Sequence, residues 1–276
     1  MPSIKDINYR LPTIEPLQKG QSFLNSANKP FVITGVDTMT GLKDDYVVKL
    51  MKAERMSEAA AMREVIAAFI AMELDLPVTL PALINMPPDF INILKGESEY
   101  LVASQSLGYN FGTRYVTGYQ VFAVNQALPN TLIDSALEIF AFDVLIQNAD
   151  RSHEAPKKPN LNTNGKQLLI FDHEVAFGFI FELPFSKNKQ PWVIRDIDKL
   201  WIEKHCLFRS LRGNLFDEQN LLHKFARLDN AFWNRCWVLL PDSWREKEQF
   251  ESIKGFVNQI VSNGSIFIKN LQLLLA

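Results

Sequence analysis

The middle of this 276-residue chain concentrates side chains that could carry out chemistry. An apolar, helix-like run ends at Gln147, and the polar segment behind it contains Asn148 and Asp150. After a Lys-, Pro- and Asn-rich turn region, residues 168–172 have the composition of a strand that ends at a second carboxylate, Asp172. Two carboxylates with an Asn between them suit phosphoryl transfer, because one can orient a hydroxyl while the other and the Asn hold Mg²⁺ on nucleotide phosphates.

A lysine and a glutamate upstream form a second informative pair. Residues 45–51 have strand composition and place Lys49 between apolar neighbours, although an edge lysine reaching towards solvent is the alternative. Ser57 can cap a helix that runs to about Leu74, and Glu64 on this helix has only alanines at its i±3 and i±4 positions. Small neighbours allow close approach, so Glu64 can reach a strand lysine, as in protein kinases.

Two weaker signals concern the nucleotide itself. Gly20 and Ser22 form a candidate phosphate-facing turn, since glycine allows close backbone approach, but an ordinary turn explains the same residues. Two later segments have strand composition, residues 99–104 and 115–124. We expect one of them to read an adenine through its backbone and favour the neighbourhood of Leu101 and Val102.

Composition excludes several classes of function. The net charge is -2, with 47% apolar and 22% charged residues, so no global field favours nucleic acid or an anionic membrane. The N-terminus lacks the apolar core of a signal peptide, and no run approaches the ~18 apolar residues of a membrane helix. Cys206 and Cys236 lack zinc or CxxC spacing. We therefore predict a cytoplasmic protein without direct contact to nucleic acid or membrane.

The order of the predicted elements indicates an α+β protein. Strands dominate the first third of the chain, and helical periodicity takes over from Thr131. No linker is long enough to separate independent domains. We predict one bilobal domain over residues 1–276, with a strand-rich N-lobe over about 1–125 and a helical C-lobe over about 126–276.

Particular residues also occur in a specific order: Lys49, Glu64, Asp150, Asn160 and Asp172. They lie in or beside the motifs YVVK, EVIAA, NADR, PNL and FDHEVAF. In this order the chain resembles the HipA-like kinase family over roughly residues 15–240. That family is a remote branch of the protein-kinase-like fold, and its active-site motifs are similar to those of phosphatidylinositol-kinase relatives.

The resemblance implies a role for each of these residues. Asp150 would orient the acceptor hydroxyl and accept its proton, while Asp172 and Asn160 would bind magnesium. Lys49 would hold the nucleotide phosphates, with Glu64 behind it. The implied activity is ATP- and Mg²⁺-dependent transfer of the γ-phosphoryl group to a hydroxyl, with a protein Ser or Thr as the expected acceptor.

Departures from the kinase pattern leave alternatives open. Asn160 lies ten residues after Asp150, whereas the catalytic loop of protein kinases has a spacing of five, so Asn162 is an alternative ligand. Glu174 stands where many kinases have a Gly, and it could add charge near the metal or point away. His153 and His173 lack zinc-type pairing and are expected to be structural or to lie behind the metal ligands.

A non-catalytic function is the alternative hypothesis. The chain could be a kinase-like scaffold that binds nucleotide, or nothing, and presents its helical lobe to a partner. The family includes toxin kinases paired with DNA-binding antitoxins, so the resemblance also implies a regulatory protein partner. The chain contains no recognisable helix-turn-helix of its own.

Overall fold

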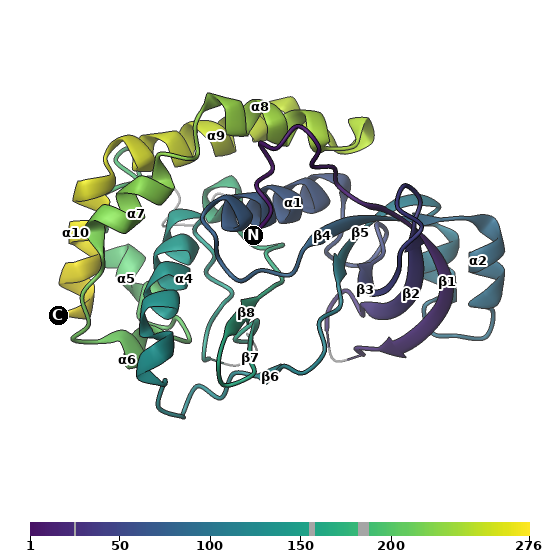
Figure 1. Ribbon diagram of the computed structural model, residues 1–276, viewed down its shortest axis with the longest axis horizontal. Coiled ribbons are helices and arrows are strands. Elements are labelled where there is room, and N and C mark those ends of the chain that lie inside the picture. Colours follow the sequence, from purple (N-terminus) through teal and green to yellow (C-terminus); the bar gives the residue numbers. More distant parts are fainter. Residues whose placement is uncertain (25, 155–157, 182–187) are drawn as a thin grey trace.

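A strand-rich N-terminal part precedes a helical C-terminal part in the computed structural model, which describes residues 1–24, 26–154, 158–181 and 188–276 (Figure 1). The N-terminal part contains a closed barrel of the strands β1 (Thr13–Ser22), β2 (Phe31–Asp37), β3 (Lys43–Lys49), β5 (Gly108–Arg114) and β4 (Pro81–Met86), in that order. Neighbouring strands are antiparallel except for β1 and β4, which are parallel.

Strand β3 shows how the barrel positions the site. Side chains alternate along a strand, so Tyr46 and Val48 point into the barrel core with Phe31. Val47 and Lys49 point the other way and line a pocket outside the barrel. The strand predicted at 45–51 is confirmed in type, with slightly different ends.

Helix α1 (Glu58–Glu73) is buried along almost its whole length. The Ser57 side chain accepts a hydrogen bond from the backbone N–H of Ala60, and Leu74 ends the helix, as the sequence predicts. The two short helices α2 (Pro88–Ile93) and α3 (Tyr100–Ser104) lie beside the barrel (Figure 1). The strand predicted at 99–104 is therefore wrong, because these residues form α3.

A small second sheet carries the central polar segment. It contains β6 (Gln120–Val121), β7 (Leu161–Thr163) and β8 (Leu168–Ile170), in the order β6-β7-β8. The strand predicted at 168–172 corresponds to β8, whereas only the two residues of β6 form a strand within 115–124. Helix α4 (Ile133–Leu145) lies between β6 and β7 in the chain and leads towards Asp150.

The C-terminal part consists of the helices α5 (Asp196–Ile202), α6 (Phe208–Leu211), α7 (Glu218–Phe225), α8 (Asn230–Leu239), α9 (Lys247–Ser262) and α10 (Gly264–Leu275), with short 3-10 turns. Their apolar faces form a core that also includes α1, α4 and the N-terminal residues Ile4 and Leu11. Arg235 Nε on α8 donates to the Ile4 carbonyl at 3.1 Å, which fixes the N-terminal segment against the helices. Across the described ranges, no helix is both long and apolar enough to span a membrane.

Candidate active site

Lys49 lies at the centre of the site, at the end of β3. Its Nζ binds the Glu64 carboxylate, lies 2.6 Å from Asp172 Oδ1 and lies 3.2 Å from Glu174 Oε2. The residue is only 8% exposed. A buried ammonium needs such partners, because its desolvation is otherwise too costly. The structure thus joins the N-terminal barrel to the segment after β8 through one amine.

Helix α1 delivers Glu64 with both of its carboxylate oxygens in use. Oε1 accepts from Lys49, and Oε2 accepts from the backbone N–H of His173 at 2.8 Å. Glu64 itself is 1% exposed, and the alanines around it let α1 lie close to the strand and the loop. This carboxylate therefore connects α1, β3 and the segment that contains Asp172.

The charges in this cluster depend on one another. Burial opposes the charge on Lys49, but Asp172, Glu64 and Glu174 together raise its pKa well above the usual value, so the amine stays protonated. Burial also favours the neutral form of Asp172, yet the attraction and hydrogen bond of Lys49 outweigh it and lower the pKa of this carboxyl. Burial raises the pKa of Glu64 to about 7 against the attraction of Lys49.

Arg151 organises the segment after α4 and is 1% exposed. Its Nε donates to Asp143 Oδ2 at 2.6 Å, and its Nη1 donates to the carbonyls of Asn160 and, at 3.3 Å, of Phe171. Its Nη2 contacts His173 Nε2 at 3.0 Å. One guanidinium therefore connects the segment that contains Asp150 to the backbone just before Asp172.

Asp143 anchors this arginine from α4. It accepts hydrogen bonds from Asn148 Nδ2 at 2.8 Å and from His205 Nε2 at 2.9 Å. Burial opposes its charge, but Arg151 and His205 outweigh burial and lower the pKa of Asp143 to about 2. The sequence pattern contained no signal for this residue, because it lies within an apolar helix.

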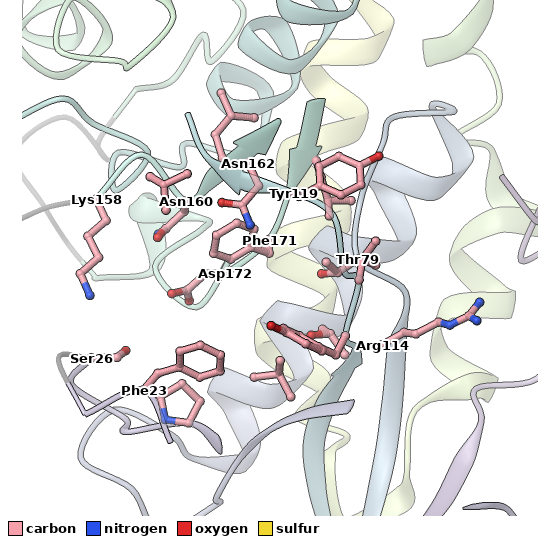
Figure 2. Close-up of a pocket in the computed structure, with 18 of the residues that line it drawn as sticks. Phe23, Ser26, Thr79, Arg114, Tyr119, Lys158, Asn160, Asn162, Phe171 and Asp172 are labelled. Atoms are coloured by element: carbon pink, nitrogen blue, oxygen red, sulfur yellow. The ribbon is translucent and has the colours of Figure 1, made fainter. Parts of the chain in front are cut away.

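Asn160 lies between Asp150 and the pocket. Its Nδ2 donates to Asp150 Oδ2 at 3.3 Å, and its backbone is left-handed, with φ 43°. Asp172 is also left-handed, with φ 62°. Such conformations cost energy in residues other than glycine and are found most often at functional sites. Both side chains line the same pocket, as Figure 2 shows.

The pocket has a volume of about 390 Å³, within the range of small-molecule sites. Its lining includes the polar or charged side chains of Lys49, Asn160 and Asp172 together with many apolar side chains. The walls come from the barrel, the small sheet and the segment between β1 and β2; they include Phe23, Ser26, Pro30, Val47, Thr79, Phe111, Val121, Lys158, Leu161, Leu169 and Phe171 (Figure 2). This mixture of hydrogen-bonding groups and apolar surface is typical of small-molecule sites.

The pocket does not include the residues that the sequence suggested for adenine contact. Leu101 is 73% exposed on α3, and neither it nor Val102 lines the pocket. Arg114, Tyr115 and Val116 line it instead, at the point where the chain leaves β5. The strand-like composition of 99–104 was misleading, because these residues pack as a short helix beside the barrel.

The predicted turn at Gly20 and Ser22 is also wrong. Both residues belong to β1, where Gly20 lies close to Val32 of β2, and the Ser22 hydroxyl binds the Glu99 carboxylate. Neither lines the pocket. The chain turns only after Ser22, because β1 continues to pair with β2 up to that residue.

The structure also addresses the residues left open by the sequence. Asn162 lines the pocket from β7, and its Oδ1 is buried without a hydrogen-bond partner among the described residues. Glu174 does not point away, since it contacts Lys49 and accepts from Asn28. His173 is buried against Arg151, as expected for a structural histidine. Asn28 was missed, because a buried asparagine in a polar turn has no sequence signature.

Comparison with known proteins identifies the family. The family model of the HipA-like kinases matches residues 25–263, so the chain belongs to this family, as the resemblance predicted. The family supports a phosphotransferase activity. A solved structure of the proinflammatory kinase CtkA from Helicobacter pylori is similar at 13% identity and a TM-score of 0.45, with 97% of each chain covered. No curated protein matches the chain in sequence.

Proposed function

We propose that this protein is a bilobal, protein-kinase-like enzyme that transfers the γ-phosphoryl group of ATP to a hydroxyl, with a protein Ser or Thr as acceptor. The observation that carries the proposal is the convergence of Lys49 and Asp172, whose Nζ and Oδ1 atoms lie 2.6 Å apart on one pocket. Family membership supports the same class of reaction. Most of the catalysis would come from positioning and charge neutralisation.

The donor atoms fit a magnesium ion. Asp172 and Asn160 offer a carboxylate and an amide oxygen on the same pocket, and Mg²⁺ prefers such hard oxygen ligands. When bound, the ion would neutralise charge on the phosphates. Lys49 would contact the phosphates, and Glu64 would keep its amine in place. Asp150, held by Asn160, would orient the acceptor hydroxyl and accept its proton.

Replacement of the proposed catalytic base tests this assignment. Asp150→Asn should retain the thermal stabilisation by ATP·Mg²⁺, because Asp150 does not contact the nucleotide in this proposal. The same variant should transfer labelled phosphate ~10²–10⁴-fold more slowly, the usual contribution of a general base. Asp134→Asn, an exposed change on α4, is the control. Unchanged phosphorylation by Asp150→Asn would refute the assigned role.

The metal assignment and the non-catalytic alternative are tested by binding. Asp172→Ala should lose the Mg²⁺-dependent part of the thermal shift, since a ligand stabilises the folded state only to the extent that it binds it. If the wild-type protein shows no shift with ATP·Mg²⁺, the scaffold hypothesis is favoured. Phosphoproteomics after expression of wild type or Asp150→Asn would identify the acceptor and separate protein from lipid or small-molecule hydroxyls.

A further inference from the structure

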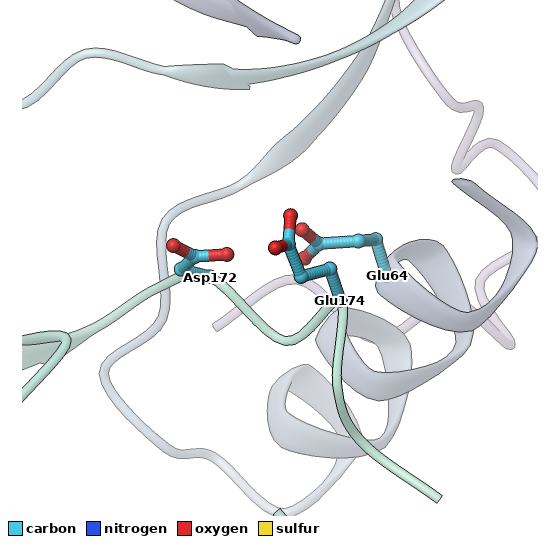
Figure 3. A group of neighbouring side chains, drawn as sticks. All are labelled: Glu64, Asp172 and Glu174. Carbon is cyan, nitrogen blue, oxygen red and sulfur yellow. The ribbon is translucent and has the colours of Figure 1, made fainter. Parts of the chain in front are cut away.

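Glu174 is a third carboxylate in the cluster around Lys49. Glu64, Asp172 and Glu174 each offer an oxygen, and these oxygens all lie within 4.8 Å of one another (Figure 3). The proposed reaction gives roles to the first two acids but not to Glu174. Burying an additional acid costs free energy unless it has partners, so its contacts indicate what it does.

A single oxygen of Glu174 has two donors. Its Oε2 lies 3.2 Å from Lys49 Nζ and also accepts from Asn28 Nδ2. Both contacts are charge-assisted, and such hydrogen bonds are stronger than neutral ones. Because the acceptor atom is shared, displacement of Asn28 changes the position of the oxygen that Lys49 contacts.

Asn28 belongs to the segment that joins β1 to β2, on the wall of the pocket. It is 5% exposed, and its Oδ1 accepts from the backbone N–H of Arg55 at 2.9 Å. The amide is thus bound on both sides, to Glu174 and to the chain after β3. Phe23, Ser26 and Pro30 of the same segment line the pocket. Figure 2 shows Phe23 and Ser26 on the opposite side of the pocket from Asp172.

We infer that Glu174 is a positioning residue that couples the segment joining β1 to β2 to the amine of Lys49 through its hydrogen bond with Asn28. The inference rests on the proposed function, because it assigns the cluster to nucleotide binding. Phe23, Ser26 and Pro30 of this segment, which line the pocket, would then lie beside the nucleotide while Lys49 is held for phosphate contact. Loss of either side chain removes the same coupling, which makes the two residues energetically dependent on each other.

A double-mutant cycle tests the coupling. Asn28→Ala and Glu174→Ala should each raise the Kd for ATP·Mg²⁺ about tenfold, the scale of a lost hydrogen bond to a charged group. The double variant should be no weaker than the weaker single variant, because both remove one interaction. Additive losses in Kd would overturn the inference.

A rescue experiment separates coupling from general destabilisation. Asn28→Asp keeps an acceptor for the Arg55 amide but places a carboxylate against Glu174, so ATP binding should weaken. Combination with Glu174→Gln supplies an amide that can donate to the new Asp, and Kd should return to that of Glu174→Gln alone. Failure of this rescue would contradict the inference. The rescue does not use Asn28→Ala, so it remains a valid test if that variant does not fold.

Controls distinguish the inference from the proposed function. Asn85 Nδ2 donates to Glu15 Oε1 at 2.6 Å between β4 and β1, and neither residue lines the pocket. Asn85→Ala should therefore leave the Kd for ATP·Mg²⁺ unchanged. If wild type does not bind ATP·Mg²⁺, both ideas fail together. If wild type binds and transfers phosphate but the cycle is additive, only the role of Glu174 fails.

Discussion

At the scale of single residues, Arg151 supports both left-handed positions of the site. Its guanidinium binds the carbonyl of Asn160 and the carbonyl of Phe171, which directly precedes Asp172. Asparagine and aspartate tolerate a left-handed backbone better than most residues, although the conformation still costs energy. The network around Asp143 and Arg151 thus compensates for strain that places the two proposed metal ligands in the pocket.

Substitution of the two asparagines distinguishes the candidate metal ligands. Asn160→Ala should raise the Mg²⁺ concentration needed for half-maximal ATP binding about tenfold, within the usual effect of an altered ligand environment. Asn162→Ala should leave this concentration unchanged, since Asn160 is the side chain bonded to Asp150. Titration of Mg²⁺ at fixed ATP, followed by thermal shift, measures both. The opposite pattern would assign the ligand to Asn162.

The buried His173 predicts a pH dependence of stability. Burial, reinforced by Arg151, lowers the pKa of His173 to about 3, so the histidine is neutral in the fold. The unfolded chain binds a proton near pH 6.5 while the native state does not, so unfolding is favoured as pH falls from 6.5 towards 3. The contribution is about 1.4 kcal/mol per pH unit across that window.

Comparison with a neutral variant isolates this effect. His173→Gln can still accept a hydrogen bond from Arg151, and its unfolding free energy should fall less steeply with acid than that of wild type. Glu64, with its raised pKa, contributes in the opposite direction in both proteins, so only the difference between their slopes is informative. Urea unfolding at several pH values between 5 and 7.5 measures this difference. Equal slopes would contradict a neutral His173.

At the scale of elements, the site depends on where strands and helices end. Lys49 is the last residue of β3, and Asp172 follows β8 after a single residue. Helix α1 contacts both segments through Glu64, which binds Lys49 and the backbone N–H of His173. The small residues of α1 permit this close packing. The chain that leaves β5 lines the pocket with Arg114, Tyr115 and Val116. We therefore expect this segment, and not α3, to contact the adenine.

Backbone substitution tests which element reads the base. Val116 lines the pocket just after β5, and Val116→Pro removes its backbone N–H. If this N–H donates to the base, the Kd for ATP should rise at least tenfold. Val116→Ala keeps the N–H and should have a small effect. Leu101→Ser, on the exposed side of α3, should have none. Calorimetric titration of ATP into the variants decides between the two elements.

At the scale of the whole molecule, the two hydrophobic cores do not follow the order of the chain. The smaller core fills the barrel, whereas the larger one joins the N-terminal segment and α1 to the C-terminal helices. Glu64 therefore lies on α1, which packs against the C-terminal helices. Its partner Lys49 is the last residue of the barrel strand β3. Their contact links the two cores at the pocket.

The N-terminal segment should contribute to stability in proportion to its burial. Ile4 is fully buried in the larger core, and Ile4→Ala should lower the free energy of unfolding by about 2–4 kcal/mol. Ile7 is 82% exposed in the same segment, so Ile7→Ala should leave stability nearly unchanged. Urea denaturation of both variants measures the difference. Equal effects would show that Ile4 is not packed in this core.

The sequence by itself indicated a strand-rich first part followed by a helical part, and it selected the polar residues of the candidate site. The useful signals were local: strand alternation, the Ser57 cap and the polar residues after α4 and β8. Such signals depend only on residues that are close in the sequence. They were sufficient to select Lys49, Glu64, Asp150 and Asp172 as a group. The family resemblance, carried by the same residues, was confirmed over residues 25–263.

Only the tertiary structure showed which residues after β5 line the pocket and which partners the charged groups have. Residues 99–104 have a strand-like composition but form α3, because packing beside the barrel outweighs weak β-propensity. The contact of Asn28 with Glu174 joins residues that are 146 positions apart, and the shared environment of Lys49 depends on the same folding. Such contacts depend on how elements that are distant in the sequence pack together. No pattern among neighbouring residues predicts this packing.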